Sequence, residues 1–502
     1  MRLSNAILPA IGRRGVAIPN YDPASITPGI FHVGTGNFHR AHLGNYMHEL
    51  FQQDPTQRHW GIIGSSVRPH TQDAKKKRLA DQDWLQTLVI MDGSNADARI
   101  LGSMIDYVSV TDPDDTSPIL RALLNPDIRI VSMTITEGGY FLNPHTGKFD
   151  SNHPAIRQDV EDMDQASTIF GLIVKALDLR RKQGLPAFTV LSCDNVPHNG
   201  DVCRNVIVGL AQLVDPTLAD WIQANASFPN SMVDRIAIAT GDRERALIQE
   251  KYGYEDVAPV VCEPFTQWVL EDDFCQGRPT WEQLDSIQFV EDVEPFERMK
   301  IRILNGGHAS LCYSAALLDI DFVHQAMEHP VLGPFLDTLE RNEIIPTVGE
   351  VPGIDLTEYW ETIQSRFANS AMCDTVARNV AQGSDRQTKF IIPVIQANLA
   401  EGHSDLQGLA TVSALWCRYC QGTTESGKVI EPNDNLWDRL HEKALLAIKN
   451  PVVWLEMEDI YGDCGKNRLF VHHFTEALQT IQKQGVEAAL KKYVESFAAA
   501  VA

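Results

Sequence analysis

Residues 29–42 read GIFHVGTGNFHRAH: a short apolar run, two glycines spaced as G-x-G, and the start of a helix-like segment. Gly34 and Gly36 let the backbone turn tightly and approach a pyrophosphate, and the N–H groups at the start of the next helix can bind its oxygens. His39 stands where the usual fingerprint has a third glycine. The segment predicts a dinucleotide site in a first βαβ unit. Its expected cofactor-binding residues are Val33, Gly34, Gly36, Asn37 and Phe38.

Strand-like and helix-like segments alternate through the N-terminal half of the chain. Further apolar runs that predict strands are found at 60–64, 85–91, 128–136 and 188–193, with helix-like stretches at 39–52 and 166–182. This alternation predicts βαβ units and a mostly parallel sheet, whose ligands bind at the carboxyl ends of the strands.

The pattern changes at about residue 296, where long amphipathic stretches begin and strand signals nearly vanish. We therefore expect an α/β protein with a Rossmann-type dinucleotide-binding domain over residues 1–295. A mainly α-helical substrate-binding domain is expected over 296–502, because amphipathic helices without strands pack on one another.

Bulk composition restricts the class of protein. The chain has 502 residues and a net charge of −23, from 43 basic and 66 acidic residues. Such a field repels nucleic acid, and no apolar run approaches the roughly 18 residues that span a bilayer. The N-terminus has no secretory signal, so we expect a cytoplasmic protein with reduced cysteines. Cys417 and Cys420 form a CxxC that is typical of a buried helix face.

Three polar segments stand where a site is expected. Residues 134–140 (TITEGGY) and 192–200 (SCDNVPHNG) follow predicted strands, and residues 300–308 (KIRILNGGH) begin the helical region. Asn195 and Lys300 could thus face each other across a domain interface. On a regular α-helix, Lys300 would lie about 140° around the axis from the next asparagine of its segment.

The residue types suit alcohol oxidation. A lysine whose pKa is depressed by burial can accept the alcohol proton, and asparagine amides such as Asn305 can hold the developing oxygen charge. His308, three residues after Asn305, aligns with it and can orient the same hydroxyl. The alternative is a solvated lysine and a capping asparagine. The pair Gly306-Gly307 is costly in a helix, which indicates that a cofactor or a strand packs there.

The second strand should end at the residue that reads the adenosine ribose. An acid there favours NAD, and a base favours NADP. No acid follows residues 60–64 until Asp73, and Arg68 is the nearest charge, unless it is merely a surface residue. NAD is the expected cofactor, and NADP stays open.

Six motifs carry a resemblance to a known family. They lie at 34–42, 130–140, 192–200, 232–236 (MVDRI), 261–265 (VCEPF) and 300–308. With them the chain resembles the polyol-specific long-chain dehydrogenases, or mannitol dehydrogenase family, over nearly its whole length. The resemblance implies a zinc-independent, NAD-dependent enzyme that interconverts a sugar alcohol of the mannitol, arabinitol or sorbitol class and a keto-sugar, and it favours a monomer.

The resemblance also implies residue roles. Lys300 matches the catalytic base, Asn195 and Asn305 the oxyanion hole, His308 the substrate histidine, and Glu297 a gate or relay for the released proton. Arg378 matches a substrate-contacting arginine. Cofactor contacts are further expected from Glu137, Val233 and Asp234.

Two positions depart from the family pattern. Arg386 stands where polyol members carry a lysine, and Lys389 follows it. These cations together with Arg378 could clamp a carboxylate, so a hexuronate (fructuronate or tagaturonate) reductase is the alternative. His70 and Thr71 stand where NAD-preferring members have acids. A non-catalytic dinucleotide sensor is the rival from another class, against which the intact Lys300, Asn305 and His308 argue.

Overall fold

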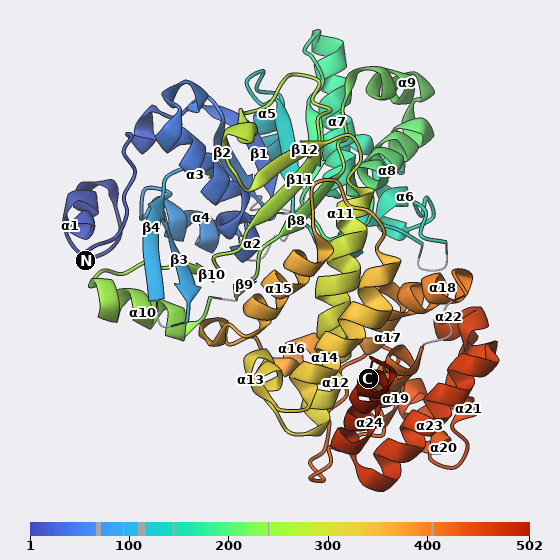
Figure 1. Cartoon of the computed structure of the whole chain (residues 1–502). Coiled ribbons are helices and arrows are strands. Elements are labelled where there is room, and N and C mark those ends of the chain that lie inside the picture. Colours follow the sequence, from blue (N-terminus) through green and yellow to red (C-terminus); the bar gives the residue numbers. More distant parts are fainter. Residues whose placement is uncertain are drawn as a thin grey trace. The chain divides into compact units, whose positions relative to one another are not determined.

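The structure is a computed structural model that describes residues 1–66, 72–93, 95–108, 117–143, 146–238, 240–402 and 406–501, with the backbone alone at 72, 73, 137 and 498–501. The chain divides into two compact units, Met1–Glu294 (unit 1) and Pro295–Ala502 (unit 2). Figure 1 shows strands in unit 1 and helices throughout unit 2.

Unit 1 contains three sheets. Its strands are β1 (Pro28–Val33), β2 (Gly61–Ser65), β3 (Gln86–Asp92), β4 (Asn95–Leu101), β5 (Met104–Val108), β6 (Ile130–Met133), β7 (Thr189–Ser192), β8 (Ser231–Asp234), β9 (Ala237–Ile238), β10 (Val260–Cys262), β11 (Gln267–Glu271) and β12 (Ile287–Val290). The largest sheet has the order β5-β2-β1-β6-β7, and every neighbouring pair in it is parallel. The predicted Rossmann-type domain is confirmed.

Helices cover both faces of this sheet. The helices of unit 1 are α1 (Leu8–Gly12), α2 (Asn37–Ala41), α3 (Leu43–Gln53), α4 (Gln72–Ala80), α5 (Ser117–Leu123), α6 (Pro154–Glu161), α7 (Ile169–Gln183), α8 (Asn199–Val214), α9 (Pro216–Asn225) and α10 (Asp242–Tyr252). In β1, Phe31 and Val33 share a core cluster with α7 and α8, whereas Ile30 shares one with α3. Successive side chains of a strand point to opposite faces, so a continuous apolar run fits a sheet buried on both sides.

Two expectations about unit 1 are wrong in detail. The run 85–91 does form a strand, β3, but it belongs to the separate sheet β4-β3-β10-β9. A turn at Gly93 (φ +54°) joins it to β4, with which it pairs antiparallel, and on its other side it pairs in parallel with β10. The expected helix over 39–52 is broken at His42 (φ −117°, ψ −100°) into α2 and α3.

Unit 2 is helical, and no strand is assigned to its described residues. Its helices are α11 (Glu294–Met299, which starts at the last residue of unit 1), α12 (Gly306–Leu317), α13 (Val323–Glu328), α14 (Leu332–Leu339), α15 (Leu356–Phe367), α16 (Val376–Val380), α17 (Gly383–Arg386), α18 (Ile392–Ala400), α19 (Gln407–Tyr419), α20 (Trp437–Ala447), α21 (Val452–Leu455), α22 (Glu458–Tyr461), α23 (Arg468–Gln484) and α24 (Val486–Val501). Cys417 and Cys420 are unpaired and buried, as predicted.

The centre of unit 2 is α12, which is almost entirely buried and packs against α13, α14, α16 and α19. Three π-helical segments, Lys300–Asn305, Glu340–Ile344 and Gln387–Ile391, interrupt the helices around it. The first of them contacts both others. Irregular π-turns are often found at functional sites.

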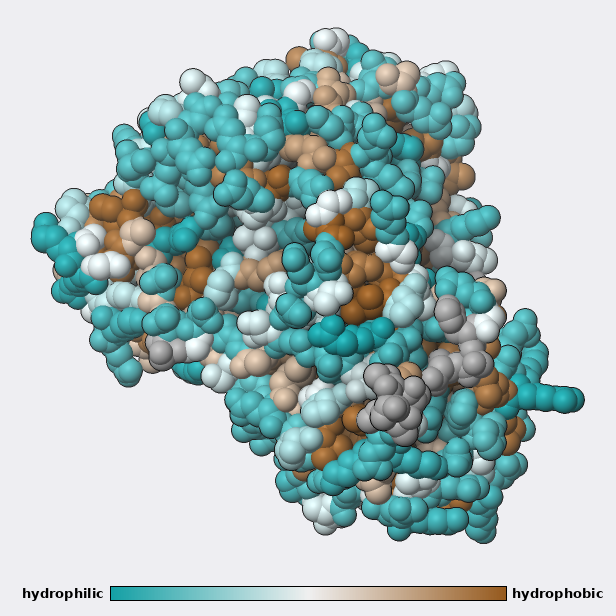
Figure 2. All heavy atoms as spheres, viewed as in Figure 1, coloured by the Kyte–Doolittle hydropathy of each residue, from teal (hydrophilic) through white to brown (hydrophobic). Residues whose placement is uncertain are grey.

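The face of the molecule seen in Figure 2 is mostly polar. Hydrophilic side chains cover most of the face in Figure 2, and hydrophobic ones form separate small groups. Within the described ranges, no helix is both long and apolar enough to cross a bilayer.

Candidate active site

The two glycines of the first turn have different reasons to be glycine. Gly34 has φ +96°, and a Cβ there would collide with the carbonyl oxygen of Thr134 in the neighbouring loop. A Cβ added at Gly36 would have its nearest neighbouring atom 3.7 Å away, so nothing inside the protein requires a glycine there. The space left beside Gly36 fits the close approach of a cofactor pyrophosphate.

His39 takes the place of the third glycine by packing inward. Its ring stacks on His32 of β1 at 3.8 Å between centroids, and His32 bonds to Ser132 (2.8 Å) and Thr134 (3.2 Å) on the β6 side. Burial lowers the pKa of His32 to about 3 and holds that of His39 well below its usual value. Both rings are therefore neutral packing elements that fix α2 against the sheet.

The remaining residues expected at the cofactor in this region are only partly described. The Asn37 amide donates to Ile238 O (3.1 Å), and Phe38 stacks on His42 at 4.8 Å. Val33 is buried at the end of β1. Arg68 lies outside the described residues, and so does the side chain of Glu137.

Asp194 joins two strand ends. Its carboxylate accepts N–H bonds from Ile135 (2.8 Å) and Thr136 (2.9 Å) and the O–H bond of Tyr140 (2.7 Å). The loop after β6 is thereby tied to the loop after β7, in which the exposed Asn195 follows directly. Thr136 has φ +68°, and such left-handed backbone at a non-glycine residue is typical of functional loops.

A second set of bonds fixes the start of β8. Asn199 donates to Asp194 O (3.1 Å) and to Ser231 O (2.8 Å). Val233 and Asp234, both buried, close the same strand. The loop that carries Asn195 is thus tied to the start of the strand that ends at Asp234.

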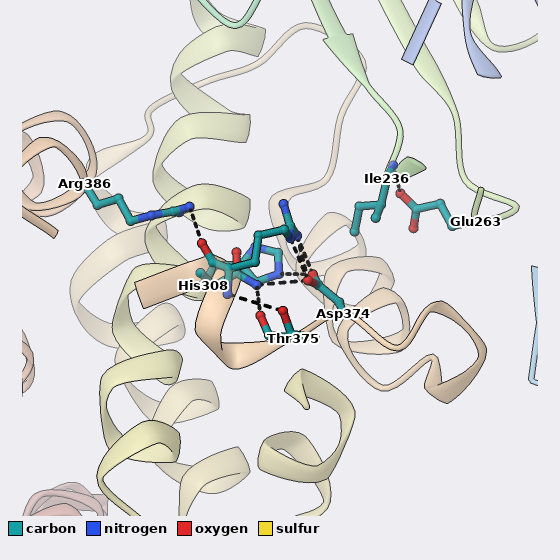
Figure 3. A network of polar contacts seen from close by, with 8 residues as sticks. Ile236, Glu263, His308, Asp374, Thr375 and Arg386 are labelled. Carbon is teal, nitrogen blue, oxygen red and sulfur yellow. Dashed lines mark hydrogen bonds and ion pairs between the residues drawn. The ribbon is translucent and has the colours of Figure 1, made fainter. Parts of the chain in front are cut away.

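The segment after Asp234 is anchored as well. Arg235 donates to Glu263 O (3.1 and 3.2 Å) and to Ala41 O (2.8 Å) at the end of α2. The Ile236 N–H donates to the Glu263 carboxylate (2.6 Å; Figure 3). These bonds connect the Met-Val-Asp-Arg-Ile motif to the helix that follows the glycine turn.

In unit 2, Lys300 to Asn305 form a π-helical turn, in which the Gly306 N–H bonds to Ile301 O, five residues back. Residues five apart in a π-turn lie nearly above one another, as residues four apart do on an α-helix. The expectation that Lys300 lies about 140° from Asn305 is therefore wrong, since it assumed a regular α-helix. His308, three residues further, continues the same face.

The environment of Gly307 explains one of the two helical glycines. A Cβ there would lie 2.9 Å from Oε1 of Glu340 and 3.3 Å from Phe367, whose ring packs on His308 at 4.0 Å. A Cβ on Gly306 would meet only ordinary contacts of 3.6 and 3.7 Å. The expectation that a neighbour packs on the glycine pair holds for Gly307, and the neighbours are side chains of unit 2.

Asp374 connects two expected substrate residues (Figure 3). Its carboxylate accepts from Nε (2.9 Å) and Nη2 (2.7 Å) of Arg378, and Nε2 of His308 lies 3.5 Å from it. Burial opposes the charge, but the hydrogen bonds from Arg378 and the nearby His308 ring outweigh it and hold the pKa of Asp374 far below its usual value. Burial also lowers the pKa of His308, although Asp374 raises it in part, so the imidazole is neutral at pH 7.

The other expected residues of unit 2 differ in exposure. Arg386 donates to Ala381 O (3.0 Å) and Arg378 O (3.3 Å). Lys389 is about half exposed (55%) and 3.6 Å from Asp385. Lys300 and Glu297 are buried.

Asp194 and Asp374 are structural anchors that the sequence interpretation did not single out. Asp374 stands four residues before Arg378, a spacing that pairs charges on a helix and could have identified it. Asp194 lies inside the quoted 192–200 motif, but its partners at 135, 136 and 140 become visible only in the folded loops.

One group in the described part of the chain has metal-ligand spacing: His472, His473 and Glu476 on α23. Two of the three are exposed, and Glu476 already pairs with Lys492 (2.8 Å). None of them belongs to a segment singled out for catalysis.

Comparison with known proteins supports the resemblance drawn from the motifs. The model of the mannitol dehydrogenase Rossmann domain matches residues 28–283, and that of the mannitol dehydrogenase C-terminal domain matches 292–482. A mannitol 2-dehydrogenase of Cereibacter sphaeroides is 46% identical over 481 residues, which is 96% of this chain and 99% of that protein.

Solved structures of similar proteins support the same family. A Pseudomonas fluorescens mannitol 2-dehydrogenase in ternary complex with NAD and D-mannitol is 37% identical with a TM-score of 0.87, covering 99% of this chain and all of the other. A substrate-free D-sorbitol dehydrogenase is 34% identical, also with a TM-score of 0.87, over 98% of this chain and 100% of its own. The chain therefore belongs to the mannitol dehydrogenase family of oxidoreductases.

Proposed function

We propose that the protein is a zinc-independent, NAD-dependent polyol 2-dehydrogenase that oxidises a sugar alcohol of the mannitol class to a ketose. Lys300 acts as the general base. The bound nicotinamide supplies the hydride acceptor. The related structure that holds NAD and D-mannitol supports this choice of cofactor and substrate class.

The observation that carries the proposal is the π-turn over Lys300–Asn305. It aligns a buried lysine with an asparagine amide and, one turn on, with a neutral histidine. An ordinary α-helix would turn the lysine about 140° away from the asparagine. The departure from regular helix thus has a chemical use.

Each side chain has a role that its chemistry supports. Lys300 is buried and takes the hydroxyl proton of the substrate as the general base. The Asn305 amide, with Asn195 as second donor, stabilises the negative charge on the substrate oxygen. Neutral His308 bonds to the hydroxyl, and Glu297 passes on the proton that Lys300 receives.

The cofactor is assigned to the turn at Gly34 and Gly36 with Val33, Asn37 and Phe38, and to the strand end at Val233 and Asp234. The open space at Gly36 fits the group. The expected contacts of Arg68 and Glu137 belong to the same assignment.

The engagement of the arginines favours a neutral substrate over a hexuronate. A carboxylate clamp needs a guanidinium that presents two N–H groups side by side. Arg378 already gives Nε and Nη2 to Asp374, and Arg386 is bound to two carbonyls. Lys389, the third cation, offers a point charge only.

A substrate panel tests the proposal. Mannitol, arabinitol, sorbitol, mannonate and altronate are compared by kcat/KM with NAD and with NADP. A polyol should give the highest value, and dominant activity on an aldonate would establish the hexuronate alternative instead. Gel filtration and cell fractionation test the cytoplasmic monomer that the family resemblance favours.

A further inference from the structure

A cavity of about 200 Å³ lies beside the glycine turn of unit 1. Thr35 and Asn37 of the turn line it, and so do four cations: Arg40 of α2, Lys75 and Arg78 of α4, and Arg245 of α10. None of the described residues that line it is acidic. In a chain of net charge −23, this is an unusual concentration of positive charge.

The cations are held at the cavity by bonds to the backbone. The Lys75 ammonium donates to Thr35 O, and Arg40 donates to Ala258 O and to Gly36 O (3.2 Å). Arg78 bonds through Nε to Ala74 O (3.2 Å), which leaves its two terminal nitrogens available among the described residues. The positive groups therefore surround the turn at which a dinucleotide is expected.

These cations repel one another. Burial, together with Arg40 and Arg78, lowers the pKa of Lys75 to about 8, and burial with Arg78 lowers that of Arg40 to about 10. Asp256, which acts on Arg40 in the opposite sense, is already bound by the Thr87 N–H (2.6 Å) and the Gln82 amide (3.0 Å). An anion in the cavity would relieve this repulsion.

A buried amide on the cavity wall also lacks a partner. Gln86 is 4% exposed, its Oε1 has no hydrogen-bond partner, and its Nε2 reaches only the sulfur of Met104 at 3.7 Å. A buried amide without partners is costly, and a flip of the side chain would present two N–H donors. A polar ligand in the cavity would satisfy it.

The position of the cations within the fold selects the kind of anion. Residues after the second strand of a Rossmann domain read the 2′ position of the adenosine ribose, whereas the pyrophosphate binds at the glycine turn. Lys75 and Arg78 lie on α4, the helix that follows β2. A group bound by both is therefore on the ribose side.

We propose that this cavity binds the 2′-phosphate of NADP, so that the protein accepts NADP as well as NAD. The inference rests on the proposed dinucleotide-dependent function. The oxygens of the monoester would accept charge-assisted hydrogen bonds from Lys75 and Arg78. Arg40, whose three guanidinium nitrogens are already bonded to Gly36, Ala258 and Asn37, adds positive charge beside them.

Fluorescence titration of the full-length protein with NADH and NADPH tests the site without turnover. The wild type should bind NADPH within about tenfold of NADH. Lys75→Gln combined with Arg78→Gln should weaken NADPH by about tenfold or more, since charged hydrogen bonds are lost, and leave NADH within about twofold. Lys77→Gln, an exposed lysine of the same helix that does not line the cavity, is the matched control and should change neither.

Competition by 2′,5′-ADP and by ADP distinguishes binding of the 2′-phosphate from binding of the pyrophosphate. In the wild type 2′,5′-ADP should displace NADPH better than ADP does, and in the double variant this advantage should be lost. Equal weakening of NADH and NADPH in the double variant would assign the cations to the pyrophosphate and overturn the proposal. Failure of the wild type to bind NADPH while it binds NADH would also overturn it. If neither nucleotide binds, the proposed function fails as well.

Discussion

Lys300 is buried in a π-turn that ends at Asn305, and His308 follows in α12. Replacing it by alanine should lower kcat for polyol oxidation by about 10³-fold, because general-base catalysis contributes that much, and should leave NADH binding unchanged. Steady-state kinetics and NADH titration measure the two effects.

The variant Lys300→Arg tests whether Lys300 acts as the general base or only supplies a positive charge. Arginine keeps the cation but does not release its proton at ordinary pH, so this variant should be almost as inactive as the alanine variant. Substantial recovery of kcat in Lys300→Arg would mean that Lys300 supplies charge and another group removes the proton.

Asp374 holds Arg378 and faces His308, so Asp374→Asn should loosen both substrate residues. We expect kcat/KM to fall about tenfold to hundredfold, since small misplacements of positioning groups cost that much. The free energy of unfolding should fall by roughly 1–3 kcal/mol at pH 7, as a buried charged hydrogen-bond acceptor is weakened.

The pH dependence of that stability loss has a defined sign. Because the pKa of Asp374 is depressed in the folded protein, its contribution is fully present above the unfolded pKa of about 3.9 and is lost progressively as pH falls from there through the lower folded pKa. The stabilities of wild type and Asp374→Asn in urea unfolding should therefore differ most near pH 7 and begin to approach each other only as pH falls below about 4. Asp385→Asn, an exposed carboxylate near Lys389, is the control and should change stability by less than about 0.5 kcal/mol.

At the level of helices, the two glycines after the π-turn differ in what surrounds them, and this gives a matched pair of variants. Gly307→Ala places a Cβ 2.9 Å from Glu340, whose pKa burial holds well above its usual value, and 3.3 Å from Phe367. Overpacking of this kind should cost about 1–3 kcal/mol of unfolding free energy. Because Phe367 packs on His308, kcat/KM should fall as well.

Gly306→Ala should behave in the opposite way. Its Cβ meets only contacts of 3.6 and 3.7 Å, and alanine is preferred to glycine in a helix by about 1 kcal/mol. Denaturant unfolding of the two variants decides the point: if both destabilise equally, helix distortion rather than the contact with Glu340 is the cause.

The elements predicted from sequence were those with strong local signals. The runs at 29–33 and 60–64 match β1 and β2 to within one residue, those at 128–136 and 188–193 contain β6 and β7, and the G-x-G turn lies between β1 and α2 as expected. The sheet membership of β3 could not be predicted, because it depends on a turn at Gly93 rather than on the apolar run. The edge strand β5 was not predicted, although four of its five residues (MIDYV) are apolar or aromatic.

The geometry of the candidate site was less accessible from sequence. The motifs identified Lys300, Asn305 and His308, but their alignment depends on one extra residue per turn, which no spacing rule for α-helices contains. In the same way, the engagement of Arg378 by Asp374 bears on the choice between polyol and hexuronate. Residue types alone could not reveal that a nearby acid binds the guanidinium.

Over the chain as a whole, two compact units with separate cores predict more than one unfolding step. Large multidomain proteins depart from two-state behaviour, so calorimetry should resolve two transitions. The assigned cofactor residues Gly34, Gly36 and Asp234 belong to unit 1, whereas Gly307 belongs to unit 2. NADH binding and the Gly307→Ala substitution can therefore show which unfolding transition belongs to unit 1 and which to unit 2.

NADH at 100 times its Kd should stabilise the transition of unit 1 by about 2.7 kcal/mol, because it binds the folded form. Gly307→Ala should lower the melting temperature of the other transition and leave the first in place. Combining the two should shift both transitions independently, since effects in separate cores add. A single transition that NADH and Gly307→Ala shift together would instead mean that the two units unfold as one cooperative body.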